Sequence, residues 1–219
     1  MKKLSIVLFL LFGQFVNAEV LNLDLSDSSK WFCFAYDDVK QNKIKFSSKG
    51  LEIDVNASAG PCIYKLDRVS KIKNFKVHAK TDAQLIFPKD KVQGEKHFDD
   101  FSLRTGLVVV GGKRPGMIAR WFIPKWVLNL YKLAPKDQGL KVIRLFTVAE
   151  DKDLLGSERL HWVSKRFSEK VSAISKNGEI VIDEPVEGLE TIAIWVMADG
   201  DDLKSKFKTV VNKIEIERD

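Results

Sequence analysis

The chain contains 219 residues, of which 45% are hydrophobic and 30% charged, and its formal net charge is +6. This balance is ordinary for a globular domain and excludes a low-complexity or intrinsically disordered chain. The positive excess is small, and no zinc-finger spacing, aromatic RNA-binding motif or dense basic helix accompanies it, so we expect no nucleic-acid partner.

Residues 1–18 have the three parts of a secretory signal peptide. A pair of lysines follows the initiating methionine, residues 4–12 form an apolar run, and Ala18 supplies the small residue before a cut at Glu19. The apolar run is about half the length that a bilayer-spanning helix needs, and no later stretch is long enough. We therefore predict cleavage after Ala18, a periplasmic or secreted location, and no transmembrane segment.

Cys33 and Cys62 are the two cysteines of the chain. Each lies in an apolar, strand-like segment, and in an oxidising compartment an isolated pair usually forms a bridge. Closing a loop of roughly 30 residues would contribute about 3–4 kcal/mol to stability. We predict a Cys33–Cys62 disulfide with a structural role, since the spacing is not the Cys-x-x-Cys of redox sites.

Beyond residue 19 the sequence alternates between apolar and polar residues, which is typical of strands in a half-buried antiparallel sheet. The alternating segments are residues 21–25, 44–46, 51–55, 75–77 and 214–216. Two segments are apolar on both faces and are predicted to be central strands: residues 107–110 and 192–197. Two further strand-length segments are rich in β-favouring residues: residues 140–149 and Arg159–Phe167.

One stretch has helical spacing instead. Its apolar positions are Ile123, Trp126, Val127, Leu130, Tyr131 and Ala134. Pro124 is tolerated in a first helical turn, and Pro135 ends the run. We predict a short amphipathic helix over Ile123–Tyr131 whose apolar stripe caps one end of the strands; the alternative is a lipid-surface or partner-binding face.

Turn signals recur at roughly ten-residue spacing along the chain, as in proteins built from two stacked antiparallel sheets. No repeat or linker divides residues 19–219. The predicted fold class is therefore mainly all-β: one antiparallel, two-sheet β-sandwich of jelly-roll type with a single inserted helix.

The densest polar cluster lies at residues 97–104, where Asp99, Asp100 and Arg104 precede a buried strand. Paired carboxylates near an arginine can polarise a substrate or hold a cation. Adjacent strand residues point to opposite faces, however, so the two aspartates are not expected to cooperate. The alternative is a strand-entry turn in which Asp caps backbone donors and Arg104 forms an ion pair. With the isolated His161, these residues are the catalytic candidates, and no Gly-x-Ser-x-Gly motif adds a nucleophile.

An acidic turn near the C-terminus contains Asp199, Asp201 and Asp202. It resembles a fragment of a calcium loop but lacks the later glutamate at EF-hand spacing. We favour a solvated turn and expect no cofactor, with calcium at these three residues as the alternative.

Two of the five tryptophans are candidates for binding a sugar. Trp121 and Trp126 bracket Pro124 beside Arg120, in the segment that interrupts the strand pattern. An exposed indole presents a flat apolar face that matches the C–H face of a pyranose ring, whereas core packing is the alternative for each.

Several segments together resemble an uncharacterised family of exported proteins of Gram-negative bacteria, known as a domain of unknown function. The matching segments are residues 31–36, residues 57–59 and the run Asp99–Val109. The turn at residues 199–203 reads Asp-Gly-Asp-Asp-Leu in place of the Asp-x-Asp-Asn-Thr associated with that family, which weakens the idea of a fixed metal site. The resemblance implies a periplasmic β-sandwich and implies no activity.

From these features we predict an exported β-sandwich that binds carbohydrate or cell-envelope glycan. One alternative is an envelope glycan hydrolase or lyase that uses Asp99, Asp100 and Arg104. Another is a structural envelope protein without a small ligand, which uses the Ile123–Tyr131 helix as its contact face. The sequence does not predict the oligomeric state.

Overall fold

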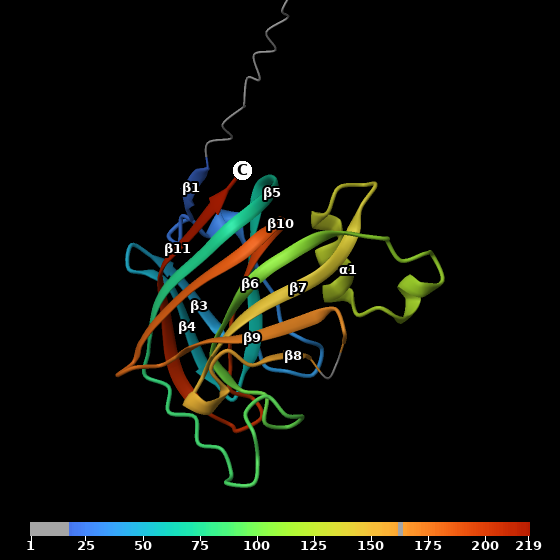
Figure 1. Ribbon diagram of the computed structural model, residues 1–219. Helices are drawn as coiled ribbons and strands as arrows, with labels where there is room; N and C mark the ends of the chain where they lie inside the picture. Colours follow the sequence, from blue (N-terminus) through green and yellow to red (C-terminus); the bar gives the residue numbers. More distant parts are fainter. Residues whose placement is uncertain (1–17, 162–163) are drawn as a thin grey trace, which may run out of the picture.

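The computed structural model describes residues 18–161 and 164–219, so the predicted signal peptide lies outside the described residues except for Ala18. The described part is dominated by strands, with one α-helix, α1 (Lys125–Leu133), and three short 3-10 helices (Figure 1). The strands are β1 (Glu19–Asn22), β2 (Trp31–Cys33), β3 (Lys43–Ser47), β4 (Gly50–Asn56), β5 (Ala59–Thr81), β6 (Phe101–Gly112), β7 (Gly139–Ala149), β8 (Glu158–Leu160), β9 (Phe167–Ile174), β10 (Glu179–Asp199) and β11 (Lys206–Arg218). The 3-10 helices are η1 (Ser28–Lys30), η2 (Ala119–Phe122) and η3 (Lys152–Leu154).

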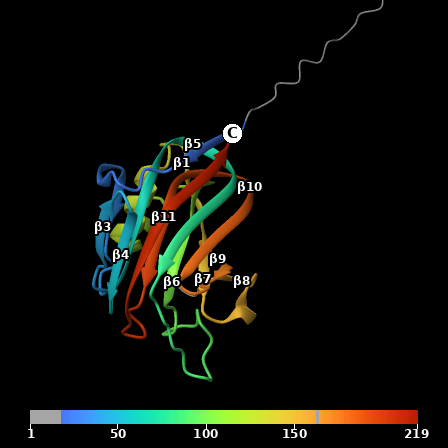
Figure 2. The same ribbon diagram turned by 90° about the vertical axis from the view of Figure 1, so that its left-hand side faces the viewer.

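Within the described residues all strands belong to one sheet, in the order β3-β4-β11-β5-β10-β6-β7-β9-β8, with β1 added to β11 and β2 added to β5. Its two long strands are β5, of 23 residues, and β10, of 21 residues. Their pairing shifts register between Pro185 and Leu189 and again between Thr191 and Ala193. Such bulges bend a strand, and here the sheet folds over into two layers (Figure 1, Figure 2). The predicted fold class is confirmed.

The main core lies between the two layers. Phe75 of β5 and Phe146 of β7 meet there, with ring centroids 5.6 Å apart. Leu51, Ile53 and Val55 of β4 are fully buried in the same core, while the polar residues between them stay partly exposed. Alternation in the sequence therefore identified the face of each strand that packs inward.

Helix α1 covers the outer face of the layer formed by β6, β7 and the second half of β10. Leu130 and Tyr131 are buried there in a second apolar cluster, which Trp126 and Val127 join from the same helical stripe. The helix begins at Lys125, directly after Pro124. The apolar stripe of the helix therefore packs on the sheet and covers it, as the first of the two sequence interpretations expected.

The prediction of one strand over Arg159–Phe167 is wrong. Strand β8 ends at Leu160, and β9 begins only at Phe167. The two strands pair antiparallel as a hairpin, with Arg159 opposite Glu169. Strand β9 also runs parallel to β7, a pairing that the antiparallel pattern did not predict.

The predicted disulfide is present. Cys33 of β2 lies directly opposite Cys62 of β5, and their Cα atoms are 4.0 Å apart. The bond therefore ties the short strand β2 to a long strand that both layers share.

Replacing both cysteines by alanine is expected to lower the free energy of unfolding by about 2–4 kcal/mol, since the unfolded chain loses its closed loop. Urea unfolding with and without reductant measures this. Reduced wild-type protein is the control and should match the double variant. Equal stability of oxidised and reduced wild type would show that strand pairing alone holds β2 in place.

In the described part of the chain no helix has the length and apolar character needed to cross a membrane.

Candidate functional site

A cavity of about 410 Å³ lies beside α1, on the outer face of the layer that contains β6, β7 and β9. This volume is in the range of small-molecule sites. The residues that line it come from the segment after β2, from β5, β6, α1, β7, β9 and β10, and from four loops. We call it the large cavity. Its lining falls into an aromatic group and a charged group.

The aromatic group centres on Trp126 of α1, which is half-buried. Its ring stacks on Phe34 at 5.9 Å and meets Tyr36 edge-on at 5.3 Å. Phe167 and Trp195 approach the same indole at 5.9 and 6.3 Å. Among the described residues, the buried Nε1 of Trp195 has no hydrogen-bond acceptor. This wall thus combines flat apolar faces with a buried indole N–H that has no acceptor among the described residues.

The charged group is organised by Arg104, whose side chain is only 3% exposed. Its guanidinium donates to Asp99 at 2.6 Å and to Asp199 at 2.8 Å, and it lies 3.5 Å from the Glu169 carboxylate. It also stands over the Phe101 ring at 4.3 Å. Burial disfavours the charged form of this guanidinium, but the three carboxylates outweigh it and raise the pKa of Arg104. A fixed positive charge therefore lies at the base of the cavity.

Asp99 links this charge to the opening of the cavity. One carboxylate oxygen accepts from Arg159 at 2.7 Å as well as from Arg104, and the other lies 2.7 Å from Nε2 of His161. Burial works against ionisation, but Arg104, His161 and Arg159 together hold the pKa of Asp99 well below its usual range. Arg159 also forms an ion pair with Glu169. An ionised Asp99 that contacts Arg104, Arg159 and His161 orients these neighbours and is poorly suited to exchange protons itself.

Asp100 directs its carboxylate to the acidic turn and not to Arg104, which agrees with the expectation that the two adjacent aspartates do not cooperate. Its two carboxylate oxygens accept from the backbone N–H groups of Asp202 and Leu203, at 3.1 and 2.8 Å. Burial nevertheless raises the pKa of Asp100 to about 6. Burial likewise raises the pKa of Asp199 well above its usual value. The Asp100 carboxyl group therefore joins the start of β6 to the acidic turn, and burial makes it easier to protonate than an ordinary aspartate.

The candidate metal ligands are brought partly together. Oxygens of Asp100, Asp199 and Asp201 lie within 4.8 Å of one another. Asp202, expected in the same set, instead accepts from the backbone N–H of Asp99 at 2.9 Å. Carboxylate oxygens suit Ca²⁺, but this ion takes six to eight oxygen ligands, of which three side chains supply a part.

Of the three residues predicted to bind a sugar, only Trp126 lines the large cavity. Trp121 is 85% exposed on η2, outside the cavity lining. Arg120 donates its Nε–H to the carbonyl of Pro115 within the same loop. Of the four catalytic candidates, Asp99, Arg104 and His161 meet in the cavity, whereas Asp100 is not part of its lining.

Two charged residues of this network were missed from the sequence: Arg159 and Glu169. A signal for Glu169 existed, because it shares the inward phase of β9 with the buried Val171 and Ala173. A carboxylate at an inward-facing position of a strand must be paired with a cation or hydrogen-bonded if it is to be buried. Arg159 lies directly opposite Glu169 in the β8–β9 hairpin, so the position of its partner depends on a pairing that the sequence did not reveal.

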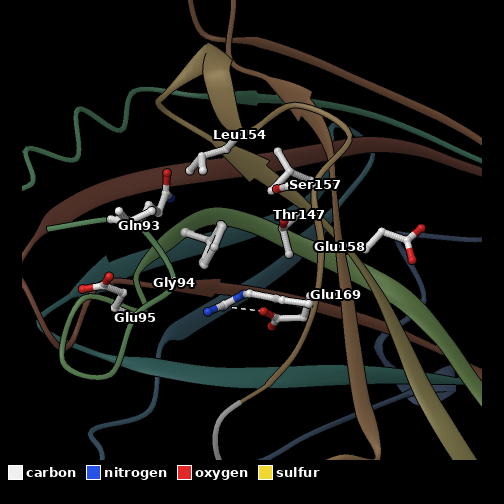
Figure 3. Close-up of a pocket in the computed structure, with 12 residues that line it drawn as sticks. Gln93, Gly94, Glu95, Thr147, Leu154, Ser157, Glu158 and Glu169 are labelled. Atoms are coloured by element: carbon white, nitrogen blue, oxygen red, sulfur yellow. Dashed lines mark ion pairs between the residues drawn. The ribbon is translucent and has the colours of Figure 1, made fainter.

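A smaller cavity of about 290 Å³ lies on the other side of Glu169, which lines both cavities. Figure 3 shows Gln93, Glu95, Thr147 and Ser157 around it, with the ion pair of Glu169 as a dashed line. Of the described residues that line it, only Phe101 is aromatic. The small cavity therefore lacks the stacking surface that distinguishes the large one.

No protein-family model and no curated protein sequence matches the chain. Among solved structures, a family 11 carbohydrate-binding module from Clostridium thermocellum, in complex with a β-1,3-1,4-mixed-linked tetrasaccharide, superposes with a TM-score of 0.45 at 11% identity, covering 90% of this chain and 94% of that one. A family 29 carbohydrate-binding module from Piromyces equi gives 0.41 at 12% identity, covering 93% of each chain. The xylan-binding module CBM15 gives 0.39 at 8% identity, covering 92% of this chain and 97% of that one. At these scores the likeness carries no argument about what this chain binds.

Proposed function

We propose that this chain is an exported glycan-binding β-sandwich protein and that its sugar site is the large cavity. The observation that carries the proposal is the aromatic wall around Trp126, placed opposite the buried Arg104–Asp99 network in a cavity of about 410 Å³. Ligand sites combine apolar walls with a few fixed polar groups in this way.

Each group of residues meets one part of a sugar. The ring faces of Trp126 and Tyr36 match the apolar C–H face of a pyranose. His161 and Asp99 offer hydrogen-bonding groups to hydroxyls. Because Asp99 is held by two arginines and His161, these groups are fixed before a ligand arrives. A site fixed in advance loses little conformational entropy on binding.

Export is part of the proposal. The predicted signal peptide supports it, and the Cys33–Cys62 disulfide is typical of proteins in oxidising compartments. A cell-envelope glycan is therefore the ligand class that we favour.

Trp126→Ala is expected to weaken binding of solubilised peptidoglycan fragments or xylan oligosaccharides at least about tenfold, because it removes the central ring of the wall. Isothermal titration with both probes measures this. Trp126→Leu, which keeps apolar contact with Phe34, separates loss of stacking from loss of folding, and melting curves accompany each variant.

Trp121→Ala is the matched control. It removes an exposed indole outside the cavity and should bind both probes like the wild type. The opposite pattern, with binding lost in Trp121→Ala and retained in both Trp126 variants, would place the glycan site on the exposed loop and reject the cavity.

A second candidate function rests on the pairing of His161 with Asp99. A carboxylate that orients an imidazole is a common arrangement for a general base. An enzyme would be favoured over a binding protein if the wild type cleaves either probe and His161→Gln still binds the probe but no longer cleaves it.

A further inference from the structure

The segment between β6 and β7 carries an exposed apolar surface that neither the cores nor the large cavity uses. Met117, Ile118, Trp121 and Phe122 are 80%, 80%, 85% and 84% exposed. We call these four residues the apolar tip. In Figure 1 their segment projects from the side of the sheet, beyond α1. Soluble proteins rarely leave several large apolar side chains exposed together, so the tip needs a partner.

The backbone folds the segment of the tip into tight turns. The Arg120 N–H donates to the Gly116 carbonyl at 3.2 Å, and the Trp121 N–H donates to the Ile118 carbonyl at 3.2 Å. In a 3-10 helix residues three apart lie on the same face, which places Trp121 of η2 beside Ile118. Met117 and Phe122 flank this pair in the sequence and are exposed as well. The loop is joined to the domain at its base, where Arg114 donates to the carbonyls of Ala134 and Pro135.

The charge around the tip has one sign. Residues 113–136 contain six lysine and arginine residues and no aspartate or glutamate. Lys113, Arg120 and Lys125 of this set are exposed beside the tip. A second copy of the chain would bring like charges together at such a patch, which disfavours self-association through it. A surface that is apolar inside and negative at its boundary fits both features.

We infer that the apolar tip inserts into the interface of a lipid bilayer that contains anionic headgroups. Trp121 and Phe122 enter the boundary between headgroups and acyl chains, and the surrounding cations contact lipid phosphates. The tip and the glycan cavity are separate surfaces, so this inference stands independently of the proposed function.

Co-sedimentation with phosphatidylcholine vesicles, prepared with and without phosphatidylglycerol, tests the inference. We expect binding to the phosphatidylglycerol vesicles that weakens as sodium chloride is added. Trp121→Ala combined with Phe122→Ala should reduce the vesicle partition coefficient by about tenfold or more, because each ring contributes buried apolar area. Lys113→Gln combined with Lys125→Gln should reduce it severalfold.

Ile86→Ala is the matched control, since Ile86 is also 83% exposed but lies outside the tip. It should bind vesicles like the wild type. All of these side chains are exposed, so the melting temperatures of the variants should equal that of the wild type. A lower melting temperature would reveal a misfolded variant. Absence of wild-type binding, equal binding to vesicles without phosphatidylglycerol, or full binding by the tip variant would each overturn the inference. If the wild type does not bind vesicles but dimerises as its concentration rises, and the tip variant stays monomeric, the partner of the tip is a second copy of this chain instead.

Discussion

Replacing Arg104 by methionine is expected to lower the free energy of unfolding by about 3–5 kcal/mol, because breaking a buried ion pair leaves charge without compensation. The side chain is 3% exposed, and its partners Asp99, Glu169 and Asp199 are 11%, 2% and 9% exposed. Arg159 still neutralises part of the charge on Asp99 and Glu169, but Asp199 loses the cation bound at 2.8 Å. Urea unfolding at neutral pH measures the effect.

The deficit of Arg104→Met should shrink at acidic pH. Burial already raises the pKa of Asp199 above its usual value, and Arg104 opposes this effect. Without the guanidinium, the ionised Asp199 carboxylate destabilises the folded state at high pH and ceases to do so once it is protonated. Arg218→Met is the control, because Arg218 is also buried but pairs with exposed carboxylates, Glu19 and Asp67, at 47% and 61%. An equal loss in both variants would mean that burial of the arginine stem, and not charge pairing, dominates.

Gly106→Ala is expected to prevent folding or to cost about 3 kcal/mol or more, at the upper end for overpacking of a core. Gly106 lies within β6 opposite Leu145 of β7 and Trp195 of β10. A Cβ atom there would lie 2.0 Å from the carbonyl oxygen of Arg144. Because that oxygen belongs to the backbone of the paired strand, it cannot rotate away as a side chain would. Yield of soluble protein and the melting temperature report the outcome.

Gly116→Ala is the matched control, since a Cβ there would meet nothing within 4 Å. Its effect should be within about 0.5 kcal/mol. A Gly106→Ala protein that melts like Gly116→Ala would show that β6 and β7 can separate locally without loss of the fold.

The sequence was most informative where the structure depends on local pattern. Alternation in β4 and β11 marked the faces that are buried, and helical spacing marked the stripe of α1 that packs on the sheet. The disulfide could be predicted because the chain has only two cysteines and each lies in a strand-like segment. These features depend on the pattern of a few neighbouring residues or, for the disulfide, on the number of cysteines in the chain.

The site was less predictable because it depends on pairings between distant segments. His161 reaches Asp99 across 62 positions, and Arg159 reaches it across 60. Both contacts require the β8–β9 hairpin to lie beside β7 through a parallel pairing, which local pattern does not encode. For the same reason Trp121 and Trp126, five positions apart in the sequence, have different surroundings: Trp126 lines the cavity, and Trp121 is exposed to solvent.

The pairing of β1 with β11 has a consequence for how the fold is reached. Glu19 and Arg218 are 199 positions apart and joined by an ion pair, so the first described strand docks on the last (Figure 1). Strand β5 likewise has β10 and β11 as its two long neighbours, both from the last part of the chain. A chain synthesised from its N-terminus therefore holds β5 without these two partners until the residues of β10 and β11 have been made. Such high contact order makes folding slow and leaves the edges of β5 open to wrong partners until β10 and β11 are present.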